Sequence, residues 1–278
     1  MDPILDAATT PYASGKMLGG KIATSGGGGI GLLVFYQPEK RNAMSVEMWD
    51  GMVEILDGFA ADDSIRCVIM TGAGDKAFVS GADISQFEKQ RSNADAQQDY
   101  NRLTTAGREK LASFPKPVIG RIRGFCMGGG LGIAMQADIR IAADDGQFGI
   151  PAARLSIAYG FDMIRKLTDL VGPAHARMIL YTGERINAQE AERIGLVNRT
   201  VPVADLDDVV LKIASTIAVN APLSIRSSKL GVAAAMQDPA DRDMAGLATI
   251  SAQCFDSEDY KEGRNAFMEK RPPVFKGR

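Results

Sequence analysis

Histidine is nearly absent from this sequence of 278 residues, in which His175 is the only one. A single histidine excludes histidine-rich zinc sites, HExxH proteases and two-histidine iron sites. Any Ser-His-Asp chemistry would depend on His175 alone. This residue follows Gly172 and Pro173, a pattern typical of the first turn of a helix, so we predict a structural role for it.

Cysteine and net charge are also scarce. The three cysteines, Cys67, Cys126 and Cys254, are far apart and odd in number. This predicts a reducing compartment, no disulfide framework and no metal site. Thirty-two basic residues against 34 acidic ones leave a net charge of −2, which is too small to attract nucleic acid or an anionic membrane.

Long apolar runs and a leader are missing as well. The longest apolar stretches, such as residues 30–36, are far shorter than a bilayer span, and the first residues form neither a basic nor an apolar leader segment. We therefore expect a cytoplasmic protein without a membrane partner. The contents of 45% hydrophobic and 24% charged residues are near the globular average and suit one large α/β domain, with or without a helical appendage.

The first half of the chain alternates between predicted strands and helices. Residues 21–24 and 31–36 flank a glycine run and predict a β-hairpin. A phosphate loop is disfavoured there because a strand, not a helix, follows. Ser45 is placed to cap a helix, and the apolar runs 67–70, 117–122 and 137–142 are typical of buried parallel strands. This alternation predicts right-handed crossovers and an α/β core.

The second half is predominantly helical. Asn187 with Glu190 forms a predicted capping box, and residues 196–201 predict one more short strand. Residues 205–270 predict three or four amphipathic helices with apolar faces. We therefore predict a flexible arm over residues 1–19, a core over residues 20–204 and a helical C-terminal region over residues 205–278.

Two loops rich in small residues are the strongest candidates for chemistry. They cover residues 77–84 (AFVSGADI) and 123–132 (RGFCMGGGLG). Small residues let a ligand approach the backbone, and two N–H groups from separate loops that meet at one oxygen form an oxyanion hole. The same glycines are equally consistent with tight helix–strand packing. A dinucleotide loop is disfavoured because GxGxxG does not occur in order.

Six short motifs follow one another between about residue 21 and residue 275. They are residues 38–45 (PEKRNAMS), 78–84 (FVSGADI), 124–130 (GFCMGGG), 147–151 (QFGIP), 188–191 with 195–198 (AQEA, GLVN) and 267–272 (FMEKRP). Together they resemble the crotonase (enoyl-CoA hydratase/isomerase) superfamily. The resemblance implies a spiral of ββα units with a helical C-terminal region that assembles as a homotrimer or a dimer of trimers.

The resemblance also implies a ligand and a chemistry. The family binds acyl-CoA thioesters and stabilises an enolate-like anion at the thioester oxygen. By position, the backbone N–H groups of Ala82 and Gly129 would form the oxyanion hole. Other matching positions would hold CoA in the same subunit: Arg41, Ala43, Ser80, Gly81, Ala82, Asp83 and Ile84. Phe267 and Lys270 would touch CoA that is bound to a neighbouring subunit. CoA would enter as part of the substrate, with no tightly bound cofactor.

The sequence departs from the family where the acid and base should be. Hydratases of the family have one glutamate two residues after the Gly-Gly-Gly run and another directly after Phe-Gly-x-Pro. These positions are Gly132 and Ala152 here, and no glutamate lies between Glu109 and Glu184. A hydratase has to activate water and protonate a carbon, so hydratase activity is not favoured.

Two residues further along are candidates to replace the missing glutamates. Some family members have a catalytic aspartate at the position of Gly160, and Asp162 lies two residues beyond it. The Tyr159 phenol could donate a hydrogen bond to a substrate, and its surroundings resemble methylmalonyl-CoA decarboxylase-like members. The alternatives are a helix-cap or dipole partner for Asp162 and core packing for Tyr159.

Three functions remain open from the sequence. The first is an acyl-CoA enzyme of the enoyl-CoA hydratase/isomerase type, with methylmalonyl-CoA-type decarboxylation as the chemistry that needs least acid/base help. The second is a non-catalytic acyl-CoA binding protein. The third is a nucleotide-binding or redox protein that uses the glycine-rich loops.

Overall fold

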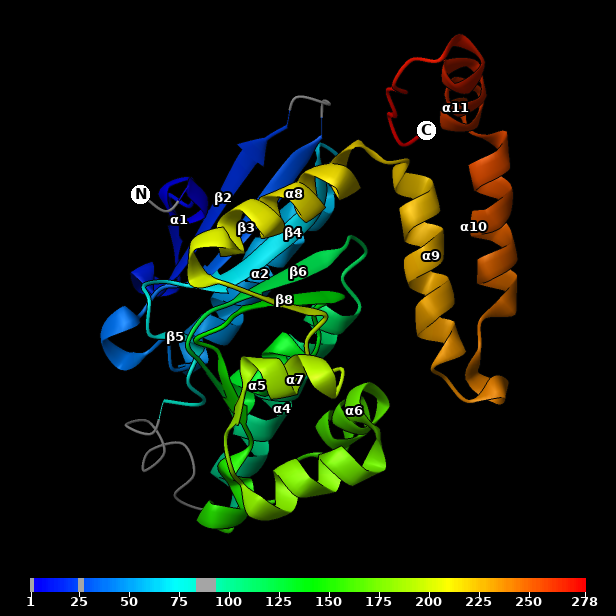
Figure 1. The fold of residues 1–278 in the computed structure, drawn as a ribbon. Helices are drawn as coiled ribbons and strands as arrows, with labels where there is room; N and C mark the ends of the chain where they lie inside the picture. The colour runs from blue at the N-terminus through cyan, green and yellow to red at the C-terminus, as the bar shows by residue number, and fades with distance from the viewer. Residues whose placement is uncertain (1–2, 25–27, 84–93) are drawn as a thin grey trace.

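The computed structural model describes residues 3–24, 28–83 and 94–278 (Figure 1). Its larger sheet has seven strands in the order β1-β2-β3-β4-β6-β8-β11. These are β1 (Thr10–Tyr12), β2 (Met17–Ala23), β3 (Gly29–Phe35), β4 (Ile65–Gly72), β6 (Val118–Ile122), β8 (Ile139–Ala143) and β11 (Arg199–Val201). The strands from β3 to β11 are parallel, whereas β2 pairs antiparallel with β3 as the predicted hairpin.

A second sheet has four strands in the order β10-β9-β7-β5. They are β5 (Ala77–Val79), β7 (Phe125–Met127), β9 (Gln147–Gly149) and β10 (Ile186–Asn187). The central turns of the chain each add one strand to the larger sheet, one to the smaller sheet and then helical structure, as in β4–β5–α4 and β6–β7–α5. This repetition confirms the predicted ββα spiral.

The helices of the described residues cover both faces of the larger sheet and extend beyond it. They are α1 (Pro3–Asp6), α2 (Val46–Ala61), α4 (Ala94–Ala112), α5 (Gly129–Ala134), α6 (Phe161–Thr182), α7 (Ala188–Arg193), α8 (Leu206–Val219), α9 (Pro222–Ala235), α10 (Met244–Asp256) and α11 (Glu258–Glu269). Short 3-10 helices are η1 (Ala13–Gly15), η2 (Pro38–Lys40), η4 (Pro151–Leu155), η5 (Val203–Asp205) and η6 (Pro239–Asp241). Among described residues no single helix has the length and hydropathy to cross a membrane, although Val203–Val219 and Pro222–Ala235 pass that test as a pair bent by 109°.

Strand β4 shows why the parallel strands correspond to continuous apolar runs in the sequence. Its side chains alternate between two hydrophobic clusters, with Val68 and Met70 in one and Cys67 and Ile69 in the other. Successive side chains of a strand point to opposite faces, so a strand that is buried on both faces needs apolar residues at every position. Helix α8 lies across one face of the sheet, and α2 with the smaller sheet lies on the other side (Figure 1).

The structure corrects both predicted domain boundaries. Residues 3–19 are not a flexible arm, because β1 pairs with β2 and the Ile4 side chain is completely buried. The core also extends past residue 205, because α8 packs on the sheet through Leu206, Val210 and Ala214, and Asp207 pairs with the buried Arg121. The amphipathic pattern of α8 does not distinguish a helix on its own sheet from a helix on a separate arm.

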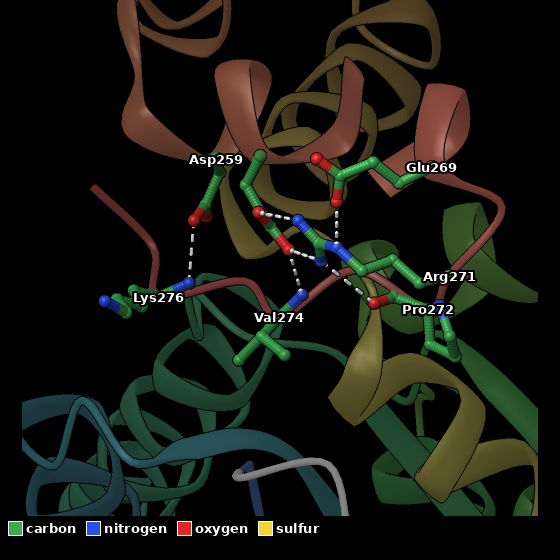
Figure 2. A network of polar contacts seen from close by, with 7 residues as sticks. Asp259, Glu269, Arg271, Pro272, Val274 and Lys276 are labelled. Atoms are coloured by element: carbon green, nitrogen blue, oxygen red, sulfur yellow. Dashed lines mark hydrogen bonds and ion pairs between the residues drawn. The ribbon is translucent and has the colours of Figure 1, made fainter. Parts of the chain in front are cut away.

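Helices α9 to α11 form a C-terminal arm beside the core (Figure 1), and Lys229 of α9 joins the arm to the core through an ion pair with Asp138 at 2.8 Å. A short tail after α11 folds back against it, as Figure 2 shows. The buried Asp259 carboxylate accepts hydrogen bonds from the N–H groups of Lys276 and Gly277, both at 2.7 Å. Arg271 pairs with Glu262 at 2.6 Å, and Glu262 also accepts the N–H of Val274 at 2.9 Å.

We expect this tail to detach in acid. Hydrogen bonds from Arg271 lower the pKa of Glu262 to about 2. An unfolded glutamate has a pKa of about 4.3. A carboxyl group whose pKa is lower in the folded state stabilises the fold at pH values above the unfolded pKa. This stabilisation is lost as the pH falls through the folded pKa. Carboxyl ¹³C NMR should therefore show Glu262 titrating near pH 2, together with the Val274 amide. In a Glu262→Gln variant the Val274 amide should not respond to pH in this range. A Glu262 midpoint near 4.3 would show that the pairing does not form.

Candidate active site

Two segments that are far apart in the sequence lie side by side at the ends of β3 and β5. The Ser80 N–H donates to the Arg41 carbonyl at 3.1 Å. The Met44 N–H donates to Gly81 at 2.8 Å, and Met44 in turn accepts the Asp83 N–H at 2.9 Å. The structure therefore brings together the residues that the resemblance assigned to CoA, apart from Ile84, which lies outside the described residues, and Phe267 and Lys270.

Asn42 fixes the first of these segments. Arg41 and Asn42 both have left-handed backbone angles, with φ of 53° and 55°. The buried Asn42 side chain donates to the carbonyls of Ala73 and Ala77 at 2.9 and 2.8 Å and accepts the Gln37 N–H at 2.9 Å. Asparagine suits this position because it tolerates a left-handed backbone and satisfies three buried backbone groups.

We predict that Asn42→Ala will destabilise the fold by about 3 kcal/mol, because it leaves buried N–H and C=O groups without partners. Urea unfolding of both proteins measures this difference. Asn265→Ala on the exposed surface of α11 serves as the control and should change the free energy of unfolding by less than about 0.5 kcal/mol. An Asn42→Ala variant as stable as the wild type would show that the three hydrogen bonds contribute nothing.

Positive charge gathers beside this loop. The Lys40 ammonium pairs with the buried Asp83 carboxylate at 2.8 Å, and this hydrogen bond raises the pKa of Lys40. The guanidinium carbons of Arg41 and Arg185 lie 5.2 and 5.0 Å from the centre of the Phe125 ring. No ion pair joins Arg41 or Arg185 to an acid in the part of the chain described here. Sequence reasoning missed Arg185, which reaches Phe125 only through the pairing of β9 with β7 and β10.

The three consecutive glycines differ in what the structure requires at each position. Gly128 has φ 52° and ψ −115°, a backbone that favours glycine at the turn from β7 into α5. A Cβ at Gly130 would lie 2.1 Å from the Val79 carbonyl oxygen, so that glycine permits close packing. A Cβ at Gly129 would meet only one group, the Ala82 nitrogen, at 4.0 Å. Tight helix–strand packing therefore explains Gly130 but not Gly129.

Ala82 and Gly129 bring two backbone N–H groups close together. With about 2.5 Å between a Cβ and its own nitrogen, their two nitrogens lie within about 6.5 Å of each other. Within the described residues, neither N–H donates a hydrogen bond to another part of the chain. Ala82 is held by its bridge to Met44, and Gly129 by the start of α5. Two backbone N–H groups that are near each other are thus without a hydrogen-bond partner among the described residues.

Other side chains surround Gly132, the position at which the resemblance places the first glutamate. Gly132 is buried, and a Cβ there would lie 2.8 Å from the Met163 sulfur and 3.2 Å from the Tyr159 hydroxyl. Ala152, at the position of the second glutamate, lies in η4 and packs against the core. Sequence reasoning missed Met163, and the only available signal was its place in the first turn of α6, near Tyr159.

Tyr159 and Asp162 are placed very differently. The Tyr159 hydroxyl donates to the Gly128 carbonyl at 3.1 Å, and burial raises the pKa of the phenol, so it stays protonated. Asp162 lies exposed in the first turn of α6, and in the described structure its carboxylate makes no hydrogen bond or ion pair. Tyr159 therefore contacts the Gly128–Gly129 loop. Among the described residues, no hydrogen bond or ion pair links Asp162 to that loop.

The predicted CoA contacts of the C-terminal region lie on the arm. Phe267, near the end of α11, is 83% exposed, and Lys270 ends this helix in a left-handed conformation. Figure 1 shows α11 well separated from α5, which begins at Gly129. Within one subunit these two residues are therefore not part of the Ala82–Gly129 site.

The fold and the paired loops define the class of protein, and comparison with known proteins agrees. The family profile for enoyl-CoA hydratase/isomerase matches residues 25–278. The chain is 39% identical to a crotonyl-CoA hydratase of Syntrophomonas wolfei, over 88% of this chain and 94% of the relative. It is 36% identical to a short-chain-enoyl-CoA hydratase of Clostridium acetobutylicum, over 88% of this chain and 93% of the relative. This protein belongs to the enoyl-CoA hydratase/isomerase family.

A solved structure extends the match over nearly the whole fold. The crystal structure of an enoyl-CoA hydratase/carnithine racemase from Magnetospirillum magneticum superimposes with a TM-score of 0.90 and 34% identity, and the match covers 99% of this chain and 98% of that one. The crotonase resemblance of the sequence motifs is thereby confirmed. Membership of this enzyme family argues against a redox protein built on the glycine-rich loops.

Proposed function

We propose that this protein is an acyl-CoA thioester enzyme that stabilises an enolate at the thioester oxygen with the N–H groups of Ala82 and Gly129. The observation that carries the proposal is that a Cβ placed on Gly129 would lie 4.0 Å from the Ala82 nitrogen, together with two N–H groups that have no partner among the described residues. Donors that are already in place where negative charge develops stabilise a transition state without having to reorganise. Residues Arg41, Ala43 and Ser80 to Asp83 would hold the nucleotide part of CoA.

Decarboxylation of a thioester of the methylmalonyl-CoA type is the reaction that this site supports best. In such a reaction the bond from the α-carbon to the carboxylate breaks, CO₂ leaves, and the electron pair forms the enolate whose charge rests on the thioester oxygen. The α-carbon then takes a proton from water. No protein carboxylate is required, and the specific support is the buried Gly132, whose surroundings are filled by Met163 and Tyr159.

Three assays distinguish the proposed functions. Calorimetry with CoA tests binding, crotonyl-CoA tests hydration and methylmalonyl-CoA tests release of CO₂. We expect CoA binding, decarboxylation and very weak hydration. Binding without turnover of either thioester would favour the non-catalytic acyl-CoA binding protein. Failure to bind CoA or either thioester would contradict the proposed function altogether.

We further propose that the C-terminal arm assembles the protein into a trimer or a pair of trimers. Its helices expose large apolar side chains, among them Met244 at 63%, Phe255 at 62% and Phe267 at 83%. An exposed apolar surface of this kind marks a subunit interface, and cyclic symmetry lets each copy cover its neighbour with the same surface. In such an assembly Phe267 and Lys270 would complete the CoA site of a neighbouring subunit.

Removing the chain after residue 239 should therefore abolish both assembly and CoA affinity. Light scattering should give three or six copies for the full chain and a smaller species for the truncated one. Lys270→Ala tests the shared site without removing a helix and should weaken CoA binding, whereas the control Lys261→Ala on α11 should not. A truncated monomer that binds CoA with undiminished affinity would contradict this proposal.

A further inference from the structure

Tyr159 acts on the same peptide group that carries one of the two proposed donors. Its hydroxyl donates to the carbonyl oxygen of Gly128 at 3.1 Å. This carbonyl and the N–H of Gly129 belong to one planar peptide and point in opposite directions. The tyrosine thus contacts one end of a peptide dipole, and the thioester oxygen of the proposed function would contact the other end.

The remaining contacts of this peptide show that it is firmly held. The Gly128 carbonyl also accepts the N–H of Gly132 at 3.0 Å, so both of its lone pairs are engaged. The preceding peptide is fixed as well, because the Gly128 N–H donates to the Gly149 carbonyl in the smaller sheet at 2.8 Å. Hydrogen bonds in a chain polarise one another, so a donor at the carbonyl strengthens the N–H at the other end of the peptide.

We propose that Tyr159 is a positioning residue that orients and polarises the Gly128–Gly129 peptide and thereby strengthens the Gly129 N–H toward the thioester oxygen. This inference rests on the proposed function. It differs from a role as proton donor to the substrate, because the Tyr159 hydrogen is committed to the Gly128 carbonyl. It differs from simple core packing because it depends on the hydroxyl rather than on the aromatic ring.

The absence of a side chain at Gly132 and the hydrogen bond made by Tyr159 are structurally linked. A Cβ at residue 132 would stand 3.2 Å from the Tyr159 hydroxyl, which is closer than an ordinary contact. A larger side chain there would compete with the hydroxyl for the space beside the Gly128 carbonyl. Gly132 thus leaves room for the tyrosine to reach the peptide, and the high pKa that burial gives the phenol keeps its proton available for donation.

The test is the infrared carbonyl stretch of butyryl-CoA labelled with ¹³C at the thioester carbon and bound to the full-length protein. In the wild type this band should lie below its position in water. Tyr159→Phe keeps the ring and should reduce the shift by about 10–30%, the size of one cooperative hydrogen bond. Replacement of Tyr159 by 3,5-difluorotyrosine, a stronger donor, should increase the shift.

The matched control is Tyr181→Phe on α6, whose side chain is 73% exposed and which should leave the band unchanged. A wild-type shift that is the same in Tyr159→Phe and in the difluorotyrosine protein would overturn the role of Tyr159 while leaving the proposed function intact. A bound thioester with no shift in the wild type would instead overturn the proposed function. If Tyr159→Phe fails to fold, the difluorotyrosine protein decides the question alone.

Discussion

Crotonyl-CoA should be hydrated by this protein about 10⁴-fold more slowly than by a family member that carries both glutamates. One positioned acid or base contributes about 10²–10⁴-fold, and this chain has Gly132 and Ala152 at both positions. Among the described residues, the polar side-chain group beside Gly132 is the Tyr159 hydroxyl, which is protonated and already donates to Gly128. Loss of absorbance of the conjugated thioester measures the rate, and a family hydratase whose sequence has both glutamates provides the comparison.

The structure also predicts how hydration could be restored. Gly132→Glu alone should fail, because its Cβ would lie 2.8 Å from the Met163 sulfur. The combination of Gly132→Glu, Ala152→Glu and Met163→Ala provides both carboxylates with space for the first, so it should hydrate crotonyl-CoA faster than the wild type. Turnover of about 10 per second by the wild type would contradict the account. Asp162→Asn and Tyr159→Phe would then show which residue had taken over.

Gly129→Ala should abolish most of the catalytic activity without harming the fold. The added methyl group would stand beside the space between the two N–H groups, 4.0 Å from the Ala82 nitrogen, and would displace a bound thioester. The Gly129 N–H is still present in this variant, but a thioester oxygen that the methyl group keeps away from it loses one donor, which costs about 10²–10³-fold in turnover; we expect a loss of about 10²-fold in methylmalonyl-CoA decarboxylation. Because no other described group outside its own helix and chain neighbours lies within 4 Å, the free energy of unfolding should stay constant or rise slightly.

Gly130→Ala is the matched comparison in the same run of glycines. Its methyl group would lie 2.1 Å from the Val79 carbonyl oxygen, so it should destabilise the protein by about 3 kcal/mol. Urea unfolding and turnover, measured on both variants, separate the two roles. A Gly129→Ala protein with full turnover would contradict the proposed oxyanion hole, whatever its stability.

The elements that could be predicted from the sequence are those set by local patterns. The apolar run at residues 67–70 gave the centre of β4, and the predicted Asn187 cap accepts the Glu190 N–H at 2.8 Å. Gly172, with φ 74°, interrupts α6 just before Pro173, so His175 does lie in a new helical turn. Ser45 is the residue before α2, but its side chain makes no capping bond.

The errors arise where tertiary contacts override local patterns. Residues 3–19 have a weak pattern and yet are ordered, because β2 offers an edge to β1 and Ile4 enters the core. The assignment of α8 failed for the same reason, since its apolar face could cover a sheet or a partner. Sequence motifs indicated Ala82, Gly129 and Tyr159, whereas Met163 and Arg185 contact the site only through the fold.

The central claim is that two backbone N–H groups stabilise an enolate in a site without carboxylates at positions 132 and 152. Its most direct test is the affinity of a CoA-linked nitronate, an anionic mimic of the enolate, relative to the matching neutral thioester. The account predicts that the nitronate binds at least about 100-fold more tightly to the wild type, as analogues of a transition state do. It also predicts that Gly129→Ala loses most of this preference. Equal affinity of the wild type for the anion and the neutral thioester would contradict the account.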